Sequence, residues 1–253
     1  MNSNINKKKI SFFTNRKFLK YIFICIILSL FFFYFYNQLI KKDKFSTIIQ
    51  DISEKYNYQL KNVEINSLQR INKSEVNNII NQYYNQSIFL LPLEVISKSI
   101  NQLSWVKDVN LYTNFNNKLN VEIFEYEPIG LLFYNNQLFY FSKNGKIIDK
   151  IREEIDENLI IFYGNQASMA AYKFLNIIDR TETVNLIKEG YYINERRWNV
   201  KLYNNILLNL SEINIEESLK NYIKLIKKFD NSDIIKIKSI DLRNTEKAII
   251  SFK

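Results

Sequence analysis

The sequence predicts an α+β protein that carries a single N-terminal transmembrane helix. Three observations lead to this class. Residues 21–40 form an uncharged, largely apolar segment of the length that crosses a bilayer. Residues 59–127 show strand and helix spacing of apolar residues in the order β-α-α-β-β. Residues 128–253 show mostly the two-residue alternation of strands, so we expect a mostly β C-terminal domain.

The N-terminal segment predicts an uncleaved membrane anchor. Residues 1–20 contain six cations and no acid, so they hold most of the net charge of +9. The positive-inside rule then places this basic tail in the cytoplasm and the body in the periplasm, as in a single-pass type II protein of the cell inner membrane. A cleaved signal peptide is the alternative, but the bulky exit at residues 34–38 lacks a small-residue cleavage site. The rest of the chain is close to balanced in charge, which does not favour nucleic-acid binding.

The composition excludes several chemistries. The chain has no histidine, the usual general base and the commonest zinc ligand, and its one cysteine, Cys25, cannot close an internal disulfide. The four glycines are too far apart for a phosphate-binding loop. Glu153-Glu154 and Glu216-Glu217 are typical of solvated helix starts, and Arg196-Arg197 of structural ion pairs. We therefore expect no catalytic residue, no cofactor, no metal site and no enzymatic activity.

Residues 59–127 predict a three-stranded sheet with two helices on one face. A short helix at residues 45–58 leads into it. Asn72 and Ser74 are N-cap candidates for the first helix, and Pro92 is typical of the first turn of the second. The expected elements are strands at 63–65, 105–112 and 119–125, a turn at 114–117, one helix with Val76, Ile79 and Ile80 inward, and another with Leu93, Ile96, Ile100 and Leu103 inward.

The second half begins at Pro128 and predicts several hairpins. Asn135-Asn136, residues 143–145 and Asn204-Asn205 have turn composition. The expected strands are 131–134, 138–141, 147–148, 159–163, 198–203, 206–210, 235–242 and 248–252, with helices at 167–180 and 216–229. Trp105 and Trp198 are interpreted as core aromatic residues.

In this order, the motifs resemble the bacterial cell division family FtsQ/DivIB, in its alphaproteobacterial form. Leu103-Ser104-Trp105-Val106-Lys107 resembles the family's entry into the second strand, and Arg196-Arg197-Trp198-Asn199-Val200 resembles a later family segment. The other similar segments are Val63-x-Ile65, Ser74-Glu75-Val76, Ser87-Ile88-Phe89-Leu90, residues 119–128, residues 140–148 and Ile240-Asp241-Leu242-Arg243. The resemblance extends over nearly the whole chain.

The resemblance implies a non-enzymatic scaffold of the divisome. It implies a POTRA domain at residues 59–127 and the family's C-terminal β domain at residues 128–253. It also implies that the body binds FtsB and FtsL in the periplasm, that the POTRA domain contacts other divisome proteins, and that the protein links early and late division proteins at the septum.

In the family, a strand of FtsB adds to a sheet edge near the C-terminus. The sequence suits this role, because a last strand is often an edge and an exposed edge offers unpaired N–H and C=O groups. The alternative is that this strand is paired inside the sheet or capped by a loop. The expected partner-binding residues are Arg243, Asn244, Thr245, Glu246, Lys247, Ala248, Ile249, Ile250, Ser251 and Phe252.

The sequence departs from the family pattern at a few turns and contacts, and two other functions compete. The departures are Ser67, Ser104, Asn116, Tyr126 and Ser142. A POTRA-bearing protein of envelope assembly or transport is the first alternative, although such proteins usually have several POTRA modules or a β-barrel. A membrane-tethered cell-wall hydrolase is the second, and it would require two buried carboxylates facing one pocket.

Overall fold

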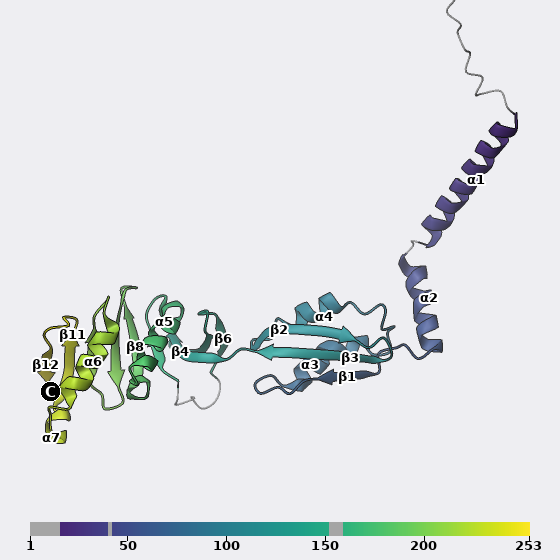
Figure 1. Cartoon of the computed structure of the whole chain (residues 1–253). Helices are drawn as coiled ribbons and strands as arrows, with labels where there is room; N and C mark the ends of the chain where they lie inside the picture. The colour runs from purple at the N-terminus through teal and green to yellow at the C-terminus, as the bar shows by residue number, and fades with distance from the viewer. Residues whose placement is uncertain (1–15, 40–41, 152–158) are drawn as a thin grey trace, which may run out of the picture. The chain divides into compact units, whose positions relative to one another are not determined.

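The computed structural model describes residues 16–39, 42–151 and 159–253 (Figure 1). The first fifteen residues of the predicted cytoplasmic tail and the Glu153-Glu154 pair lie outside this part. The described chain falls into two compact units. One contains the residues up to Ile65 with Asn78–Ile96 and Leu111–Val121, and the other contains Asn66–Asn77, Ser97–Asn110 and Glu122–Lys253. The N-terminal sheet contributes residues to both units.

Helix α1 (Arg16–Leu39) contains the predicted membrane-spanning segment. Its 24 residues extend about 36 Å, which is enough to cross the hydrocarbon core. Within the described residues, α1 is the one helix that is long and apolar enough to span a membrane. None of its apolar segment Leu19–Tyr36 is buried within the protein. The predicted apolar helix is therefore confirmed, and it begins five residues before the expected boundary at residue 21.

Helix α2 (Lys42–Lys55) follows α1 and corresponds to the short helix expected at residues 45–58. It is attached through polar side chains. The buried hydroxyls of Ser53 and Ser87 lie 2.7 Å apart, and the amide of Gln50 bonds with the backbone at Asn85 and Ser87. Because a buried hydroxyl is costly without a partner, this pairing fixes the orientation of α2.

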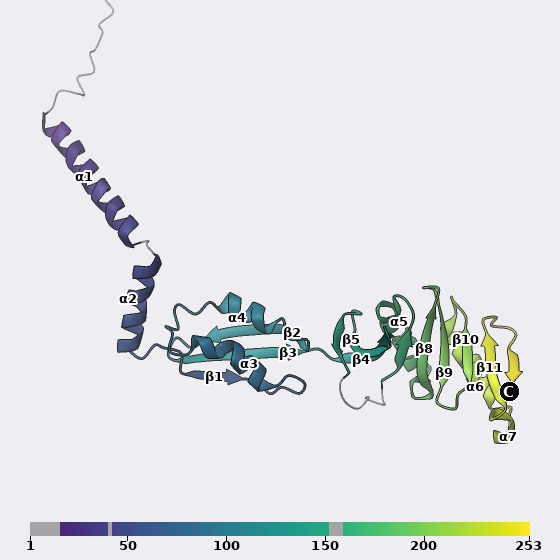
Figure 2. The ribbon, with the colours of Figure 1, turned by 180° about the vertical axis from the view of Figure 1, so that it is seen from behind.

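The N-terminal sheet has the strand order β1-β3-β2. Strand β1 (Asn62–Ile65) pairs in parallel with β3 (Lys118–Glu125), and β2 (Val106–Thr113) occupies the other edge. Helices α3 (Lys73–Ile80) and α4 (Leu93–Ile100) lie on one face, as Figures 1 and 2 show from opposite sides. The predicted β-α-α-β-β order is thus confirmed. The side chains that are fully buried between helices and sheet include Val76, Ile80, Ile96, Ile100 and Leu119.

The helix starts in this domain follow the expected capping chemistry. Asn72 accepts a hydrogen bond from the backbone of Ser74 at 2.9 Å, so it is Asn72 that caps α3. The carbonyl of Pro92 accepts the first helical bonds of α4, from Val95 and Ile96. The short 3₁₀ turn η1 (Asn81–Tyr83) follows α3 directly.

Glu125, at the end of β3, orders the loop before α3. Its carboxylate accepts backbone hydrogen bonds from Gln69, Arg70 and Ile71, each at 2.8 Å. Partial burial raises the pKa of Glu125, but the three N–H donors and the Arg70 charge outweigh burial, so the net pKa is below its ordinary value. One carboxylate therefore connects the last strand of the sheet to the start of the first helix.

The C-terminal domain is a nine-stranded sheet in the order β12-β11-β10-β9-β8-β7-β4-β5-β6. The strands are β4 (Pro128–Tyr134), β5 (Gln137–Ser142), β6 (Ile147–Lys150), β7 (Ile161–Tyr163), β8 (Ile187–Ile193), β9 (Arg197–Leu202), β10 (Leu207–Leu210), β11 (Ile237–Leu242) and β12 (Ile249–Phe252). Helices α5 (Ala167–Arg180) and α6 (Ile215–Ile226) pack on the sheet, with the short turns η2 (Val184–Leu186) and α7 (Asn231–Ile234) between elements. This confirms a mostly β domain.

The aromatic core explains one strand that the periodicity missed. Phe162 has edge-on ring contacts with Phe141, Phe174 and Trp198. A Cβ at Gly190 would lie 3.0 Å from the Phe162 ring, so glycine leaves room for the aromatic side chain. Gly190 and its charged neighbours interrupt the alternation in β8, and for this reason residues 187–193 were not predicted as a strand.

Candidate partner-binding edge

Strand β12 is an edge of the nine-stranded sheet. Among the described strands it pairs with β11 alone, antiparallel, with Ile249 opposite Asp241 and Ile250 opposite Ile240. The alternative of a strand paired on both sides within the described sheet is therefore excluded. One prediction is refined: the strand begins at Ile249, and residues 243–248 form the loop that leads to it.

The backbone of β12 has a defined outer side. The N–H of Lys253 donates to the carbonyl of Lys236 at 2.9 Å, so Lys253 faces the sheet. Because N–H and C=O groups alternate sides along an antiparallel strand, those of Ile249 and Ser251 also face β11, and those of Ile250 and Phe252 face outward. The outward groups can extend the sheet by one strand.

The side chains of β12 divide between the two faces of the sheet. Ile250 and Phe252 share one face, where Ile250 packs against the main core and Phe252 is 55% exposed, and Ile249, which is 68% exposed, lies on the other face. A strand added at this edge could place apolar side chains beside both exposed residues. The site thus combines unpaired backbone groups with apolar contact area.

The loop before β12 is held by its own polar side chains. Asp241 accepts hydrogen bonds from the backbone and guanidinium of Arg243, and Asn244 accepts one from the backbone of Glu246 at 2.8 Å. The hydrogen bond from Arg243 is the main cause that lowers the pKa of Asp241 below its ordinary value. Arg243 therefore acts in the structure as a loop staple, with its side chain about half exposed.

Two polar residues of α6 hold this loop in place. Neither was predicted to do so from the sequence. Ser218, fully buried, donates to the carbonyl of Leu242 at 2.9 Å. Asn221 donates to the carbonyl of Thr245 at 2.8 Å. They lie three residues apart and so share one face of the helix. The spacing of these two polar residues on an amphipathic helix could have indicated a shared contact. It could not have identified the partners, because the carbonyls that they bond are 24 residues away in sequence.

The loop and α6 together form a basic hollow beside the edge. Its lining includes Lys224, Lys228 and Lys247, with Glu246 as the acid among them. The positive charge lies next to the start of β12 because Lys247 is two residues before it. A partner segment with acidic residues would be favoured here over a basic one.

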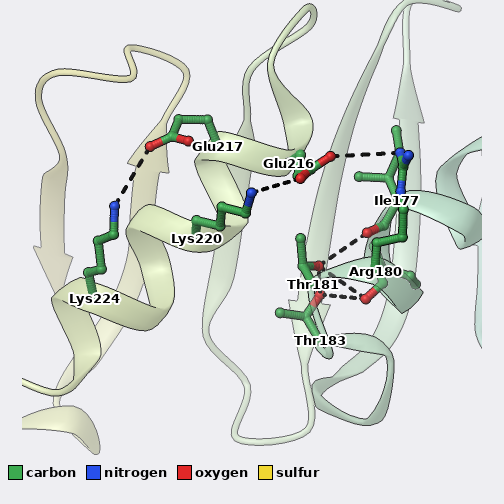
Figure 3. A network of polar contacts seen from close by, with 9 residues as sticks. Ile177, Arg180, Thr181, Thr183, Glu216, Glu217, Lys220 and Lys224 are labelled. Atoms are coloured by element: carbon green, nitrogen blue, oxygen red, sulfur yellow. Dashed lines mark hydrogen bonds and ion pairs between the residues drawn. The ribbon is translucent and has the colours of Figure 1, made fainter.

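The other polar clusters are structural. Glu216, at the start of α6, pairs with Lys220 at 2.7 Å and with Arg180 at 3.7 Å, and Glu217 lies 3.9 Å from Lys224 (Figure 3). The same view shows Thr181 and Thr183 bonded to the end of α5. Arg196 pairs with Glu212 at 3.5 Å, as expected for a structural ion pair.

The described residues do not contain the carboxylate pair that a hydrolase would need. In that part of the chain, Glu189 is the one buried acid, and it is bonded to Tyr191 and Lys201. Nor do three or more Asp, Glu, Cys or His side chains come together there as a metal site would require.

Two of the departures from the family pattern have visible consequences. Tyr126 accepts a hydrogen bond from the ammonium of Lys146 at 3.0 Å, and this ammonium also lies 4.6 Å from the ring centre. Ser142 is buried, and its hydroxyl has no hydrogen-bond partner in the described residues. Tyr126, which departs from the family pattern, therefore contacts the ammonium of Lys146 through both its hydroxyl and its ring.

Comparison with known proteins agrees with this architecture. Residues 58–126 match the model of the POTRA domain, FtsQ-type, and residues 132–243 match that of Cell division protein FtsQ/DivIB, C-terminal. The fold and these matches define a POTRA-containing cell division protein with a candidate N-terminal transmembrane helix. The second match ends at Arg243, so β12 lies beyond it.

Relatives support the same assignment over most of the chain. Cell division protein FtsQ of Rickettsia typhi is 29% identical over 210 residues, which cover 81% of this chain and 76% of that protein. Cell division protein FtsQ of Agrobacterium fabrum is 23% identical over 207 residues, which cover 80% of this chain and 64% of that protein. The chain belongs to the FtsQ/DivIB family.

A solved structure has a weaker likeness. The major extracytoplasmic domain of the cell division protein DivIB from Geobacillus stearothermophilus is 13% identical, with a TM-score of 0.31, over 42% of this chain and 96% of that chain. No argument rests on this similarity.

Proposed function

We propose that the protein is a non-catalytic scaffold of the divisome that captures a strand of FtsB, together with FtsL, at β12. In this proposal α1 anchors the chain in the inner membrane at the septum, with its N-terminus in the cytoplasm and the body in the periplasm. The POTRA domain contacts other division proteins, and the two domains together link early and late components.

One observation carries the proposal. Strand β12 is a sheet edge with outward backbone groups at Ile250 and Phe252 and with exposed apolar side chains at Ile249 and Phe252. The family membership supplies the divisome context. Main-chain hydrogen bonds would provide affinity, and the side chains beside them would provide specificity.

A matched pair of isoleucines at the two edges of the sheet tests the proposal. Ile249 begins β12 and Ile147 begins β6, and both are exposed. Affinity of the purified full chain for the FtsB–FtsL complex would be measured with Ile249→Asp and with Ile147→Asp. We expect Ile249→Asp to weaken binding by about 30-fold, since an apolar contact is lost and a charge on an edge strand disfavours strand pairing.

The control and the thermal unfolding curve decide the outcome. Ile147→Asp should leave affinity unchanged, and both variants should unfold close to the wild-type midpoint because the side chains are exposed. Unchanged binding by a folded Ile249→Asp variant would contradict the proposal. A loss confined to Ile147→Asp would move the partner to β6 and would contradict it equally.

A further inference from the structure

Helix α2 exposes a row of apolar side chains that no described residue covers. Phe45 is 57% exposed, Ile48 47%, Ile52 51% and Tyr56 60%. The spacing puts all four on one side of the helix, and Tyr56 continues the helical bonding by donating to the carbonyl of Ile52 at 3.0 Å. We refer to these four residues as the apolar stripe.

The stripe is not the surface by which α2 attaches to its own domain. That attachment uses a different side of the helix, where Gln50 and Ser53 bond with the loop that contains Ser87. Ser53 and Ser87 are both at most 1% exposed, so this contact is already complete. The helix is therefore held in one orientation, with a second, apolar side left open.

The charged residues of α2 are distributed asymmetrically around the stripe. At 100° per residue, Lys44 and Lys55 border the stripe most closely and Asp51 lies just beyond them, whereas Glu54 lies on the far side. The Lys55 ammonium lies 5.6 Å from the centre of the Tyr56 ring. Lysines that border an apolar face are typical of helices that lie in a membrane interface, where the stems stay in the apolar layer and the ammonium groups reach the headgroups.

The position of α2 in the chain identifies what can cover the stripe. Helix α1 ends at Leu39 and α2 begins at Lys42, so the connection spans at most about 11 Å. If α1 crosses the bilayer, the first turn of α2 must lie at the membrane surface. A lipid surface is thus within reach of the stripe regardless of any other protein.

Aromatic residues next to α2 add to the exposed apolar area. Tyr58, bonded to the end of the helix through Ser53, makes an edge-on contact with Phe89, with ring centres 5.6 Å apart. Phe89 in turn stacks on Phe115 at 6.2 Å. Phe89 is 52% exposed and Phe115 is 64% exposed, and both belong to the same compact unit as α2.

We propose that α2 lies in the plane of the outer leaflet with the apolar stripe inserted among the lipids. The anchor is then bipartite: α1 crosses the membrane, and α2 rests on it and restrains the domain to which Ser53 and Gln50 attach it. This inference rests on the membrane-spanning role of α1, and it is independent of strand capture at β12.

Site-directed spin labels on the full chain test this arrangement. In a Cys25→Ser background, a nitroxide would be attached at Ile48→Cys or Ile52→Cys on the stripe, at Glu54→Cys on the far side, and at Leu28→Cys within α1. The chain would be reconstituted alone in nanodiscs of phosphatidylethanolamine and phosphatidylglycerol. Collision rates with oxygen, which partitions into lipid, and with a water-soluble nickel complex would be compared.

The labels on the two sides of α2 should behave differently. We expect those at residues 48 and 52 to favour oxygen, at a depth of about 5–10 Å below the headgroup surface, and the label at residue 54 to favour nickel. A label at residue 48 as accessible to nickel as that at residue 54 would overturn the inference. So would protection that appears only after the FtsB–FtsL complex is added, because the stripe would then be a protein-binding surface.

The label at Leu28 separates this inference from the proposed topology. Lipid exposure at residue 28 together with water exposure at residue 48 would refute only the in-plane helix. Water exposure at both positions would refute the membrane-spanning α1 and, with it, the inference. Binding at β12, measured on the separate Ile249→Asp and Ile147→Asp pair, is unaffected by either result.

Discussion

The two edges of the C-terminal sheet differ in how their outer backbone groups are occupied. In β6, the N–H of Ile151 donates inward to Leu138, so the N–H of Lys150 faces outward, where it donates to the carboxylate of Asp149 at 2.8 Å. In β12, the outward N–H groups belong to Ile250 and Phe252. The residues before these, Ile249 and Ser251, carry no carboxylate.

An aspartate also bonds to the following backbone N–H on the edge strand β2 of the N-terminal sheet. There the carboxylate of Asp108 accepts a hydrogen bond from the backbone of Val109 at 2.9 Å. Charged residues on edges discourage unwanted strand pairing, so β2 and β6 are both protected by a neighbouring aspartate. The comparison teaches that β12 differs from the other two by lacking this protection and by exposing apolar side chains.

The largest effect should come from proline at an outward N–H of β12. Phe252→Pro removes one outward donor and an exposed aromatic side chain while leaving the bonds to β11. We expect affinity for the FtsB–FtsL complex to fall about 100-fold, because the hydrogen bond and the aromatic contact that are lost are each worth about 1.4 kcal/mol. Lys150→Pro, which removes the corresponding donor of β6, should leave affinity unchanged in the same titration; equal losses would mean that the two edges do not differ.

A smaller effect should follow from loosening the loop before β12. Asn221→Ala removes the hydrogen bond to the carbonyl of Thr245. We expect the free energy of unfolding to fall by about 1 kcal/mol and partner affinity to fall about fivefold, since the edge becomes less well positioned. Lys220→Ala, on the adjacent exposed position, should change neither by as much. Calorimetric titration and urea unfolding would check both variants, and an unchanged affinity for Asn221→Ala would remove the loop from the binding site.

The comparison can also be reversed at β6. Asp149→Val removes the carboxylate that occupies the outward N–H of Lys150. We expect the purified chain to self-associate weakly through this edge, as an unprotected strand does. Sedimentation velocity should detect the change, with Asp179→Val on the exposed side of α5 as the control. A strictly monomeric Asp149→Val variant would show that the aspartate does not protect the edge.

The smallest effect concerns pH and the Arg243 staple. The hydrogen bond from Arg243 holds the pKa of Asp241 below its ordinary value of 3.8. A lowered pKa in the folded state stabilises the protein above that value, and this contribution is lost as the pH falls through the folded-state pKa. Arg243→Gln should lower the stability near neutral pH only slightly, because the Arg243 side chain is exposed to solvent, and it should flatten this part of the acid unfolding profile. An identical acid profile for the variant would contradict the assignment.

The sequence was most informative where a single element determines its own structure. The hairpin at Asn135-Asn136 was predictable because both residues adopt positive φ, at 48° and 58°, and asparagine tolerates that conformation. Helix α5 was predicted with its observed bounds, since its apolar spacing is regular. The edge at residues 248–252 was expected because a last strand is often an edge, and β12 occupies an edge of the sheet.

Features that depend on distant contacts were not predictable in this way. Strand β8 was missed because Gly190 serves the Phe162 ring, which belongs to another strand. The roles of Ser218 and Asn221 depend on how α6 lies against the loop after β11, and periodicity within the helix does not contain that information. The protection of β6 by Asp149 becomes visible only once the strand order identifies β6 as an edge.

The parallel pairing of β10 with β11 makes the proposed docking surface at β12 conditional on the tertiary fold. Parallel neighbours cannot be joined by a tight turn, so the chain must pass through α6 before β11 reaches its place beside β10. The hairpin of β11 and β12 can therefore pair with β10 only after α6 has packed on the sheet. A partner that recognises β12 would consequently discriminate a fully assembled domain from an incompletely folded one, which would turn recruitment into a checkpoint on the quality of the scaffold.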